Sequence, residues 1–551
     1  MKYLFVKPHL PLKVARSLHA LLHLEPLELE IVAGGLDRKH DVTILDLSLA
    51  GKPEEKFISE IRRSQPDVIG FTAYSNQANN LLKLAEIAKN ELRDVVTLAG
   101  GVHVTIAPDF FTGCKSIDLL IRGEGGSVIA ELSDAIEKKL PFPENRSIIP
   151  IKSANFSELI AGPPPLLPDY KDVPPPRRDL VDSSKYHCVW TGEPGEKVKT
   201  IFPHVATVRT STGCPHRCNF CVVHFLANGK YMQRTPEDVV DELASLEQDY
   251  VYFVDDEMFI NAKRTEKIAN LLLERGIKKH YISWARSDTI CKHPELFKLW
   301  KRAGLSTLYV GLESLDSETL EKYNKGFAPD MNRNAVKILE ECGICLHAAF
   351  MTRPDFEKED FIQLRRMVES IGPAEVTFTV FSPPPGTEIW DETKDQFIVD
   401  DPYYFYDCMH SILPLKLPMN KFYRYFSLLS LFALRNNPWR ARKVKVPLKD
   451  MIRLFIAGVR YGHALRNIYK DYKMLLILIL ISSLTACRTS TVRKTGVQQK
   501  TAAETYKLEK VPDEYFRTLN LKKSKKVENF DVKVINRKKQ VVNIKNTKKN
   551  K

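Results

Sequence analysis

Three cysteines at the spacing C-x3-C-x2-C, Cys214, Cys218 and Cys221, constrain this chain more than any other feature. Thiolates are the usual protein ligands of iron–sulfur clusters, which normally take four cysteines. A local run of three leaves one iron open to a substrate or cofactor. Gly213 and Pro215 suit the short loop that three converging sulfurs need. The alternatives are a zinc knuckle or three unrelated thiols, but zinc sites usually close with four ligands and no second pair follows directly.

Length and cysteine distribution bound the class of protein. A chain of 551 residues exceeds what one hydrophobic core supports, so we expect two or more domains. Ten cysteines scattered over this length do not form a disulfide framework. An open cluster needs free thiolates, and residues 1–7 lack the apolar core of a signal peptide, so we expect a cytoplasmic location. The cysteines expected to be buried apolar residues are Cys291, Cys342, Cys345 and Cys408.

The formal charge of +14 is distributed unevenly along the chain. Residues 488–551 contain 19 Lys plus Arg and 6 Asp plus Glu, and residues 411–473 contain 14 and 2. Residues 1–410 therefore carry a net charge of −11. Surfaces that bind nucleic acid are basic, so we do not expect the cysteine-bearing part of the chain to bind nucleic acid.

Residues 1–140 alternate short apolar runs with segments of helical spacing. This alternation predicts an open, doubly wound α/β sheet of parallel strands. Ligands of such sheets bind beyond the carboxyl ends of the strands. Glycines there let a ligand approach the backbone, although simple strand-to-helix turns contain them too. The predicted strands are residues 3–6, 41–45, 68–71, 95–98 and 119–121, and the turns after them include residues 7–9, 72–76, 100–103 and 122–126.

Proline separates this region from the next. Residues 141–200 contain runs such as Pro163–Pro165, which favour extended backbone, so we expect a linker with little regular structure. Residues 201–400 return to strand–helix alternation, and about six repeats predict a partial β/α barrel. Thr235 followed by Pro236 predicts a helix start. The loops at the carboxyl ends of these strands are expected to form the site.

Polar residues follow several predicted barrel strands. Asp255, Asp256 and Glu257 come after the second strand, where carboxylates are able to accept hydrogen bonds from an ammonium group or, alternatively, to cap a helix. Arg286 ends the third strand and is expected to pair either with a ligand carboxylate or with Asp256. The fourth strand closes with Gly311, Leu312, Glu313 and Ser314, and a proline-rich turn, residues 382–387, follows the sixth.

Residues 401–473 combine aromatic, aliphatic and basic side chains, with a predicted basic helix over residues 448–469. Such a composition is typical of a helix on a membrane surface, and it also suits a basic helical cap on the barrel. Residues 474–486 are apolar but too few to span a bilayer comfortably, and with Cys487 they resemble a lipoprotein signal peptide. We therefore expect residues 474–551, with their disordered basic tail, to be a separate lipoprotein start joined by gene fusion, by a frameshift or by a misannotated gene boundary.

The cysteine run resembles the signature of radical S-adenosylmethionine enzymes. The predicted domain order resembles the cobalamin-binding (class B) methylases of that family, with similar turns at residues 100–105, 123–125 and 383–387. Residues 253–256, 310–314, 334–339 and 349–356 are similar to members that methylate hopanoid lipids. The resemblance covers residues 1–470 and implies the same domain architecture.

This resemblance implies a [4Fe-4S] cluster, S-adenosylmethionine and cobalamin as cofactors. In the family, reductive cleavage of S-adenosylmethionine gives a 5'-deoxyadenosyl radical that removes hydrogen from an unactivated carbon. That carbon then takes a methyl group from methylcobalamin. The implied substrate is a hopanoid methylated at C-3 of its A ring. A reductant such as flavodoxin or ferredoxin, and peripheral membrane contact through residues 411–473, are the implied partners.

The resemblance also assigns residues to the cofactors. It gives Cys214, Cys218 and Cys221 to the cluster. The chain has no D-x-H-x-x-G motif, so the resemblance offers no histidine as the lower ligand of cobalt. The residues assigned to S-adenosylmethionine are Asp255, Asp256, Glu257, Arg286, Gly311, Glu313 and Ser314, and those assigned to cobalamin are Tyr74, Ser75, Gly100, Gly101, His103, Gly123 and Glu124.

Three other functions are consistent with parts of this pattern. One is the same chemistry on a peptide or another natural product. A second is tRNA methylthiolation, which needs three more cluster cysteines in the N-terminal domain, whereas residues 1–140 contain only Cys114. The third is a cobalamin- or iron–sulfur-binding regulator without catalysis, which has no need of an open iron site.

Overall fold

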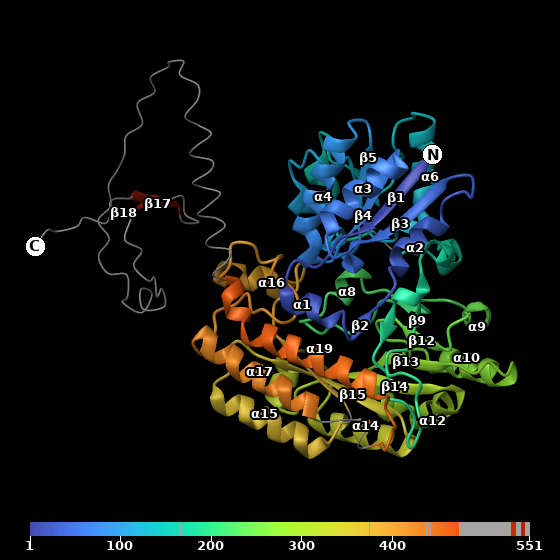
Figure 1. The fold of residues 1–551 in the computed structure, drawn as a ribbon, viewed down its shortest axis with the longest axis vertical. Helices are drawn as coiled ribbons and strands as arrows, with labels where there is room; N and C mark the ends of the chain where they lie inside the picture. The colour runs from blue at the N-terminus through green and yellow to red at the C-terminus, as the bar shows by residue number, and fades with distance from the viewer. Residues whose placement is uncertain are drawn as a thin grey trace, which may run out of the picture. The chain divides into compact units, whose positions relative to one another are not determined.

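The computed structural model describes residues 1–472, except residues 166, 374, 436–438 and 440–441, together with residues 531–535 and 541–545 (Figure 1). The chain divides into two compact units, residues 1–478 and 479–551. The described residues of the second unit are two antiparallel strands, β17 (Asp531–Ile535) and β18 (Val541–Lys545). The predicted lipoprotein-like segment, residues 474–487, lies outside the described residues.

The first unit opens with a six-stranded sheet in the order β3-β1-β4-β5-β6-β7. In β1, which is the second strand in that order, alternate side chains face two separate hydrophobic cores, one on each face of the sheet. Leu4 and Val6 pack with helices α3 and α4 on one face, while Tyr3 and Phe5 pack with α2 and α6 on the other. The predicted doubly wound sheet is therefore confirmed. The elements are β1 (Lys2–Lys7), α2 (Leu27–Gly34), β3 (Asp41–Asp46), α3 (Pro53–Ser64), β4 (Val68–Thr72), α4 (Ala78–Glu91), β5 (Val96–Gly100), β6 (Leu119–Ile121) and α6 (Ile129–Glu137).

The proline-rich segment contributes more structure than the sequence predicts. β7 (Ile148–Pro150) adds to the first sheet as its antiparallel edge strand, next to β6. Another short strand, β8 (His187–Cys188), pairs with β2 (Leu22–His23). Proline lacks a backbone N–H and is tolerated at a sheet edge, which is where Pro150 lies.

The second sheet has six parallel strands in the order β16-β15-β14-β13-β12-β9. Within this sheet, each strand pairs with the strand that precedes it and the strand that follows it along the chain, as the predicted partial β/α barrel requires. Thr235 caps the first outer helix by accepting a hydrogen bond from the backbone N–H of Asp238, as predicted. The elements are β9 (Val205–Val208), α9 (Pro236–Ser245), β12 (Tyr250–Phe253), α10 (Ala262–Glu274), β13 (His280–Ala285), α11 (Ser287–Lys292), α12 (Pro294–Ala303), β14 (Leu305–Glu313), α14 (Pro329–Cys342), β15 (Cys345–Thr352), α15 (Lys358–Ile371) and β16 (Glu375–Val380).

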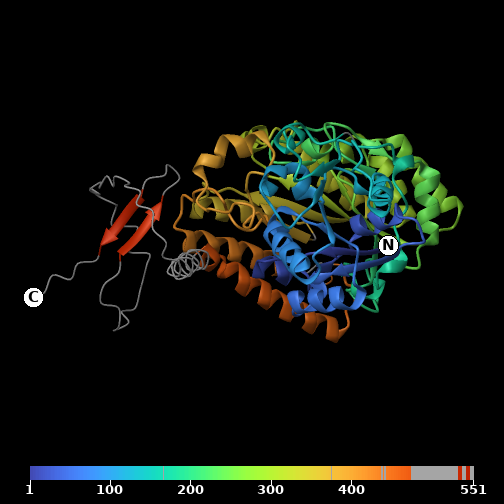
Figure 2. The same ribbon diagram turned by 90° about the horizontal axis from the view of Figure 1, so that it is seen from above.

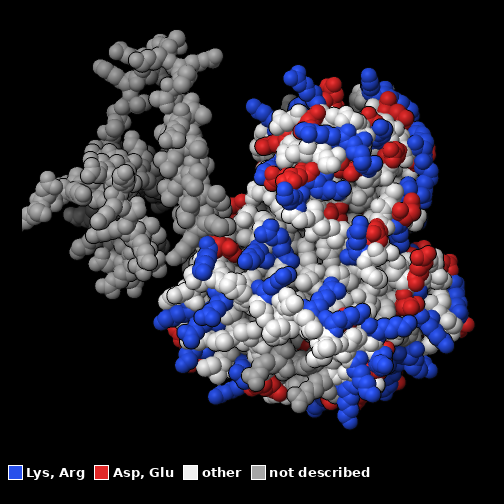
Figure 3. Space-filling view, in the orientation of Figure 1, with Lys and Arg blue, Asp and Glu red and all other residues white. Residues whose placement is uncertain are grey.

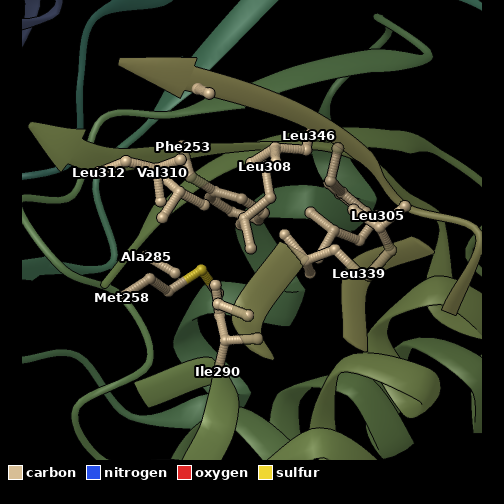
Figure 4. Close-up of a cluster of buried hydrophobic side chains, with 14 of the residues drawn as sticks. Phe253, Met258, Ala285, Ile290, Leu305, Leu308, Val310, Leu312, Leu339 and Leu346 are labelled. Carbon is tan, nitrogen blue, oxygen red and sulfur yellow. The ribbon is translucent and has the colours of Figure 1, made fainter. Parts of the chain in front are cut away.

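The barrel core lies between the strands and the outer helices (Figure 4). Leu308 and Val310 of β14 point toward Ile290 of α11 and Leu339 of α14. Trp300 of α12 is fully buried, and its indole N–H donates to the backbone oxygen of Thr265, 3.1 Å away. Burial of this apolar layer fixes the strand positions, so the loops at their carboxyl ends are held in place.

Two long helices follow the barrel, α17 (Met419–Arg435) and α19 (Leu448–Arg466). They pack against each other along one flank of the barrel and are drawn in orange in Figures 1 and 2. α17 also packs on α15 and β16, whereas α19 packs on α1 (Lys13–Leu18). Among the described residues, no helix combines the length and apolar character needed to cross a bilayer.

Candidate active site at the facing edges of the two sheets

The three cysteines lie on a loop between two short paired strands. β10 (Ser211–Thr212) and β11 (Met232–Gln233) are antiparallel, and the chain between them contains the cysteines and the short helix α8 (Val223–Leu226). Gly213 begins the loop with a φ of +91°, and a Cβ there would lie 2.2 Å from the backbone oxygen of Lys230. Only glycine fits this position, so the sequence closes the base of the loop with a residue that has no side chain.

The cysteine thiols sit at the carboxyl ends of the barrel strands. Cys218 is buried, and its sulfur accepts a hydrogen bond from Nη1 of Arg286 at 3.3 Å. Burial raises the pKa of Cys214 to about 11 and that of Cys221 to about 12. Within the described residues, no three His, Cys, Asp or Glu side chains are gathered as the ligands of a single metal ion. A cubane cluster uses one cysteine for each of three irons, so it suits thiols that are spread along a loop.

Two of the three acidic residues after β12, Asp255 and Glu257, are buried and bind neighbouring loops, whereas Asp256 lines a cavity. Asp255 is buried and accepts hydrogen bonds from Thr210 N at 3.0 Å, Thr210 Oγ1 at 2.7 Å and the Ser211 hydroxyl. Glu257 is also buried and accepts from the backbone N–H groups of Phe259 and Arg286. These two carboxylates hold neighbouring loops.

Asp256 points the other way and lines the cavity described below. Its Oδ2 accepts the Gly213 backbone N–H at 2.7 Å, which ties the triplet to the start of the cysteine loop. Burial raises the pKa of its carboxyl group. Of the three predicted acids, Asp256 is the one whose carboxylate reaches the open space.

Arg286 does not pair with Asp256, which was one of the two predicted partners. Its Nε donates to Asp288 Oδ1 at 2.9 Å, and its Nη2 donates to the backbone oxygen of Lys325 at 2.7 Å. With Nη1 on Cys218, the guanidinium joins the cysteine loop to the loop after β14. The structural ion pair therefore forms with an acid two residues further along the chain, which the sequence pattern did not single out.

The end of β14 holds a nearly buried ion pair. Lys325 Nζ lies 3.2 Å from Glu313 Oε1, and the two side chains are 6% and 13% exposed. Glu313 has a φ of +58°, which is uncommon for a residue with a side chain and costs about 1 kcal/mol or more. A Cβ on Gly311 would lie 2.3 Å from Glu313 Oε1. Glycine at 311 therefore makes room for the Glu313 carboxylate.

Ser314 supports the turn that follows. Its hydroxyl accepts the Asp316 N–H at 3.0 Å. Asn332, which is fully buried, donates from Nδ2 to the backbone oxygens of Leu312 and Ser314 at 3.0 and 2.9 Å. The sequence prediction missed Lys325 and Asn332, because neither belongs to the motif at the strand end.

A cavity of about 410 Å³ lies between the edges of the two sheets. One side consists of the turns after β4, β5 and β6 in the first sheet. The other side consists of the start of the barrel and the cysteine-bearing loop. The ion pair between Glu124 of the first domain and Arg209 of the barrel, at 2.6 Å, lies at this junction. The lining residues include Thr72, Tyr74, Gly100, Gly101, Gly123, Glu124, Arg209, Thr212, Leu226, Val254 and Asp256.

Comparisons with known proteins identify both halves of this arrangement. The B12 binding domain family matches residues 16–133, and the Radical SAM superfamily matches residues 208–368. Hopanoid C-3 methylase from Methylococcus capsulatus is 30% identical over 406 residues, which cover 73% of this chain and 75% of that protein. This chain belongs to the cobalamin-binding radical S-adenosylmethionine methylases.

Other similar proteins agree with this membership. An uncharacterized methyltransferase from Pyrococcus horikoshii is 30% identical over 66% of this chain and 78% of its own length. The solved structure of TsrM from Kitasatospora setae, a radical S-adenosylmethionine methyltransferase with cobalamin and a [4Fe-4S] cluster bound, shares the fold. Its TM-score is 0.55 at 15% identity, covering 86% of this chain and 98% of TsrM.

The enzyme is a cobalamin-dependent radical S-adenosylmethionine C-methyltransferase, and its cofactors are a [4Fe-4S] cluster, S-adenosylmethionine and cobalamin. The residues present fit these groups. Three thiols share one loop next to a guanidinium, and the first sheet faces the cavity with glycines at the ends of two strands, β5 and β6. Gly101 has a φ of +95°, and a Cβ there would lie 2.7 Å from Thr72 Oγ1. The neighbouring turn therefore leaves no room for a side chain at Gly101. Where glycines line the cavity, no side chain separates a ligand from the backbone.

The residues predicted to contact cobalamin fall into two groups. Tyr74, Gly100, Gly101, Gly123 and Glu124 line the cavity. Tyr74 is 56% exposed.

Ser75 and His103 do not line the cavity. The His103 Nδ1 lies 3.2 Å from the Ser75 hydroxyl, and the ring is fully buried among Phe110, Phe111 and Tyr403. Burial lowers the pKa of His103 to about 3, so the ring is neutral. In this structure, both residues are part of the packing beneath the turns rather than of the cavity wall.

The proline-rich turn after β16 contacts the first domain. Gly386 has a φ of +80°, and a Cβ there would lie 3.0 Å from the backbone oxygen of Ile106, in α5 (Val102–Ile106). Cys408 differs from its prediction, since it is exposed and has a φ of +62°, whereas Cys342 and Cys345 are buried as predicted. The Cys408 backbone oxygen accepts the N–H of Val380, so the unusual conformation lies directly beside the end of β16.

Proposed function

We propose that the enzyme methylates an unactivated carbon of a polycyclic lipid, namely C-3 of the A ring of a hopanoid. The observation that supports this substrate is the 30% identity to the hopanoid C-3 methylase of Methylococcus capsulatus over three quarters of that protein's length. The same chemistry on another natural product or peptide is the alternative. Two other functions, tRNA methylthiolation and regulation without catalysis, are disfavoured, because the chain belongs to the methylases.

In this proposal, the cofactors supply the radical and the methyl group, and the chain supplies position and exclusion of water. Cys214, Cys218 and Cys221 hold the cluster, and Arg286 donates a hydrogen bond to one of their sulfurs. Asp256 offers a carboxylate to the ammonium group of S-adenosylmethionine at the cavity wall.

The loop after β14 provides the second cofactor wall. Glu313 offers a carboxylate to a ribose hydroxyl, and its ion pair with Lys325 fixes the direction of that carboxylate. Asp255, Glu257, Gly311 and Ser314 act by shaping the loops that carry these groups. Their roles are positional in this proposal.

The edge of the first sheet is proposed to hold cobalamin, and it carries fewer charged side chains than the barrel loops. Gly100, Gly101 and Gly123 let the cofactor approach the backbone, while Tyr74 and Glu124 bound the space from either side. Ser75 and His103 support the turns from beneath. The reaction further requires a low-potential reductant, such as flavodoxin or ferredoxin. We propose that it takes place in the cytoplasm, which is a reducing compartment. We also propose peripheral contact with a membrane through residues 411–473.

Anaerobic reconstitution tests this proposal. The enzyme is loaded with iron, sulfide and methylcobalamin, and is given a reductant, methyl-deuterated S-adenosylmethionine and a hopanoid. We expect 5'-deoxyadenosine and a hopanoid that carries the deuterated methyl group at C-3, both detected by mass spectrometry. Cys218→Ala should form neither product. Formation of 5'-deoxyadenosine without methylated hopanoid would refute the substrate and leave the reaction class standing.

A further inference from the structure

α19 exposes an unusually apolar face. Six of its large apolar side chains are at least 44% exposed, and they recur at the three- and four-residue spacing of one helical stripe. Leu448 and Phe455 are the most exposed, at 73% and 71%. In the described part of the chain, 17 large apolar side chains are exposed, and eight of them lie on α17 and α19, so this is a patch and not a scatter. The eight are Leu428, Leu431, Leu448, Met451, Ile452, Phe455, Ile456 and Val459.

The stripe is separate from the face that holds α19 to the protein. Tyr461, Ala464 and Leu465 are buried against the rest of the fold, where α19 packs on α17 and α1. Leu431 of α17 extends the exposed surface, since its side chain lies next to Gly462 of α19. Folding of the first unit is therefore complete without the stripe, which leaves this apolar area for contact with something else.

The charges around the stripe are almost entirely positive. Lys443, Lys445, Lys449 and Arg460 are exposed, and none of them has an ion-pair partner among the described residues. The acidic residue of α19, Asp450, is buried, and its carboxylate accepts the Ile201 N–H at 2.9 Å. Figure 3 shows this part of the surface as uncharged side chains bordered by Lys and Arg.

We infer that α19 docks on the surface of an anionic lipid bilayer. An in-plane helix places apolar side chains at the acyl boundary and basic side chains among the phosphates. The 19 residues of α19 span about 28 Å at 1.5 Å per residue, so the stripe is long enough to lie along a membrane surface. α19 exposes no carboxylate, so its whole exposed face is compatible with a continuous layer of phosphates. This inference deepens the membrane contact proposed above for residues 411–473, and it does not depend on which carbon the enzyme methylates.

Vesicle sedimentation with the full-length holoenzyme tests the docking. We expect partition to vesicles of phosphatidylcholine with 30% phosphatidylglycerol to exceed partition to pure phosphatidylcholine by roughly tenfold, and to weaken in 0.5 M salt. The double variant Ile452→Ser/Phe455→Ser should lose roughly tenfold in partition, because it removes two side chains from the acyl boundary. Lys449→Gln/Arg460→Gln should lose the preference for phosphatidylglycerol and retain weak binding to both vesicles.

A matched control tests whether vesicle binding depends on α19 or on exposed apolar side chains in general. Leu140→Ser/Phe142→Ser removes two exposed apolar side chains outside α19, which are 55% and 38% exposed, and should partition like the unchanged enzyme. Cobalamin absorbance and the unfolding temperature report whether each variant is folded and loaded. Equal partition of the Ile452→Ser/Phe455→Ser variant and the unchanged enzyme would overturn the inference, since another segment would then carry the binding. A dimer in vesicle-free solution that this variant dissociates would also overturn it, in favour of self-association.

Discussion

The two sheets face the same cavity with edges of different composition. The first sheet presents backbone, with Gly100, Gly101 and Gly123 at the ends of its strands. The barrel presents polar side chains such as Arg209 and Asp256. Behind its loops, outside the cavity lining, further charges are held in pairs, Arg286 with Asp288 and Lys325 with Glu313. The pair of Glu124 and Arg209 joins the two edges.

This difference follows from what each edge has to accommodate. A large rigid ligand is admitted most simply where the edge carries no side chains, as at Gly100, Gly101 and Gly123. A small ligand with charged groups needs charges in fixed directions, and buried charges keep their direction only when paired. Ligand binding at the edge of the first sheet should therefore be sensitive to added side-chain volume. Ligand binding at the edge of the barrel should be sensitive to the loss of a charge.

Removing a cysteine ligand should have the largest effect. For Cys218→Ala, we expect loss of cluster iron and a fall in methylation of at least about 10³-fold, or roughly 4 kcal/mol. Cobalamin binding should persist, because Cys218 lies in the barrel and not on the first edge. Iron analysis and cobalamin absorbance measure the two edges separately. Cys342→Ala, at the end of α14, is the control and should keep both cofactors. Loss of cobalamin together with iron would mean that the edges do not act independently.

Breaking the Glu313–Lys325 pair should cost somewhat less. Because both side chains are nearly buried, Lys325→Met or Glu313→Gln alone should lower the free energy of unfolding by about 3 kcal/mol. The double variant should lose less than the sum, which denaturant titration of all four proteins measures. Affinity for S-adenosylmethionine should fall in each variant that lacks Glu313.

An exposed pair provides the control for this cycle. Lys322 and Glu318 are 2.7 Å apart but 59% and 74% exposed, so Lys322→Met and Glu318→Gln should each change stability by less than about 0.5 kcal/mol. Additive losses at Glu313 and Lys325 would show that the two charges are not coupled, and would contradict the proposal that Lys325 fixes the direction of the Glu313 carboxylate.

Adding one carbon to the first edge should weaken cobalamin binding. For Gly101→Ala, we expect affinity to fall about 100-fold, or roughly 2.7 kcal/mol, because the new Cβ meets Thr72 Oγ1 and the Ala73 backbone at a positive φ. Iron content should not change. Gly113→Ala also has a positive φ, +74°, but meets no atom within 4 Å, so it separates backbone strain from the clash. Equal losses in both variants would attribute the effect to strain alone.

Much of this arrangement is predictable from sequence because it depends on local patterns. Alternating apolar runs predict both parallel sheets, the spacing of Cys214, Cys218 and Cys221 predicts the cluster loop, and Thr235–Pro236 predicts a helix start that the structure confirms. Each of these signals lies within a few residues of the feature it predicts.

The directions of side chains were not predictable in the same way. His103 and Gly101 belong to one turn, yet the ring packs inward while the glycine lines the cavity. Lys325 reaches Glu313 only because the chain folds back over twelve residues, and β7 pairs with β6 across a proline-rich segment. These contacts depend on tertiary packing, so neither propensity nor motif spacing indicates them.

A buried histidine behind the turn that follows β16 provides the smallest test, because its backbone oxygen accepts a hydrogen bond from Ser382 of that turn. The test asks whether the barrel edge of the cavity responds to pH. His410 is fully buried, with Nδ1 3.0 Å from Asp407 and Nε2 3.2 Å from Asp471. Burial alone would lower its pKa, but the two carboxylates raise it to about 9. Since the folded pKa lies above the unfolded value, the stabilisation is complete below pH 6.5 and is lost as pH rises through about 9. We expect the free energy of unfolding to fall by about 2 kcal/mol between pH 6.5 and 8.5, and His410→Gln to abolish this slope. Cofactor loading should not follow the same curve. If it does, the helices after β16 are coupled to the cavity, and the two edges are not the only parts that control it.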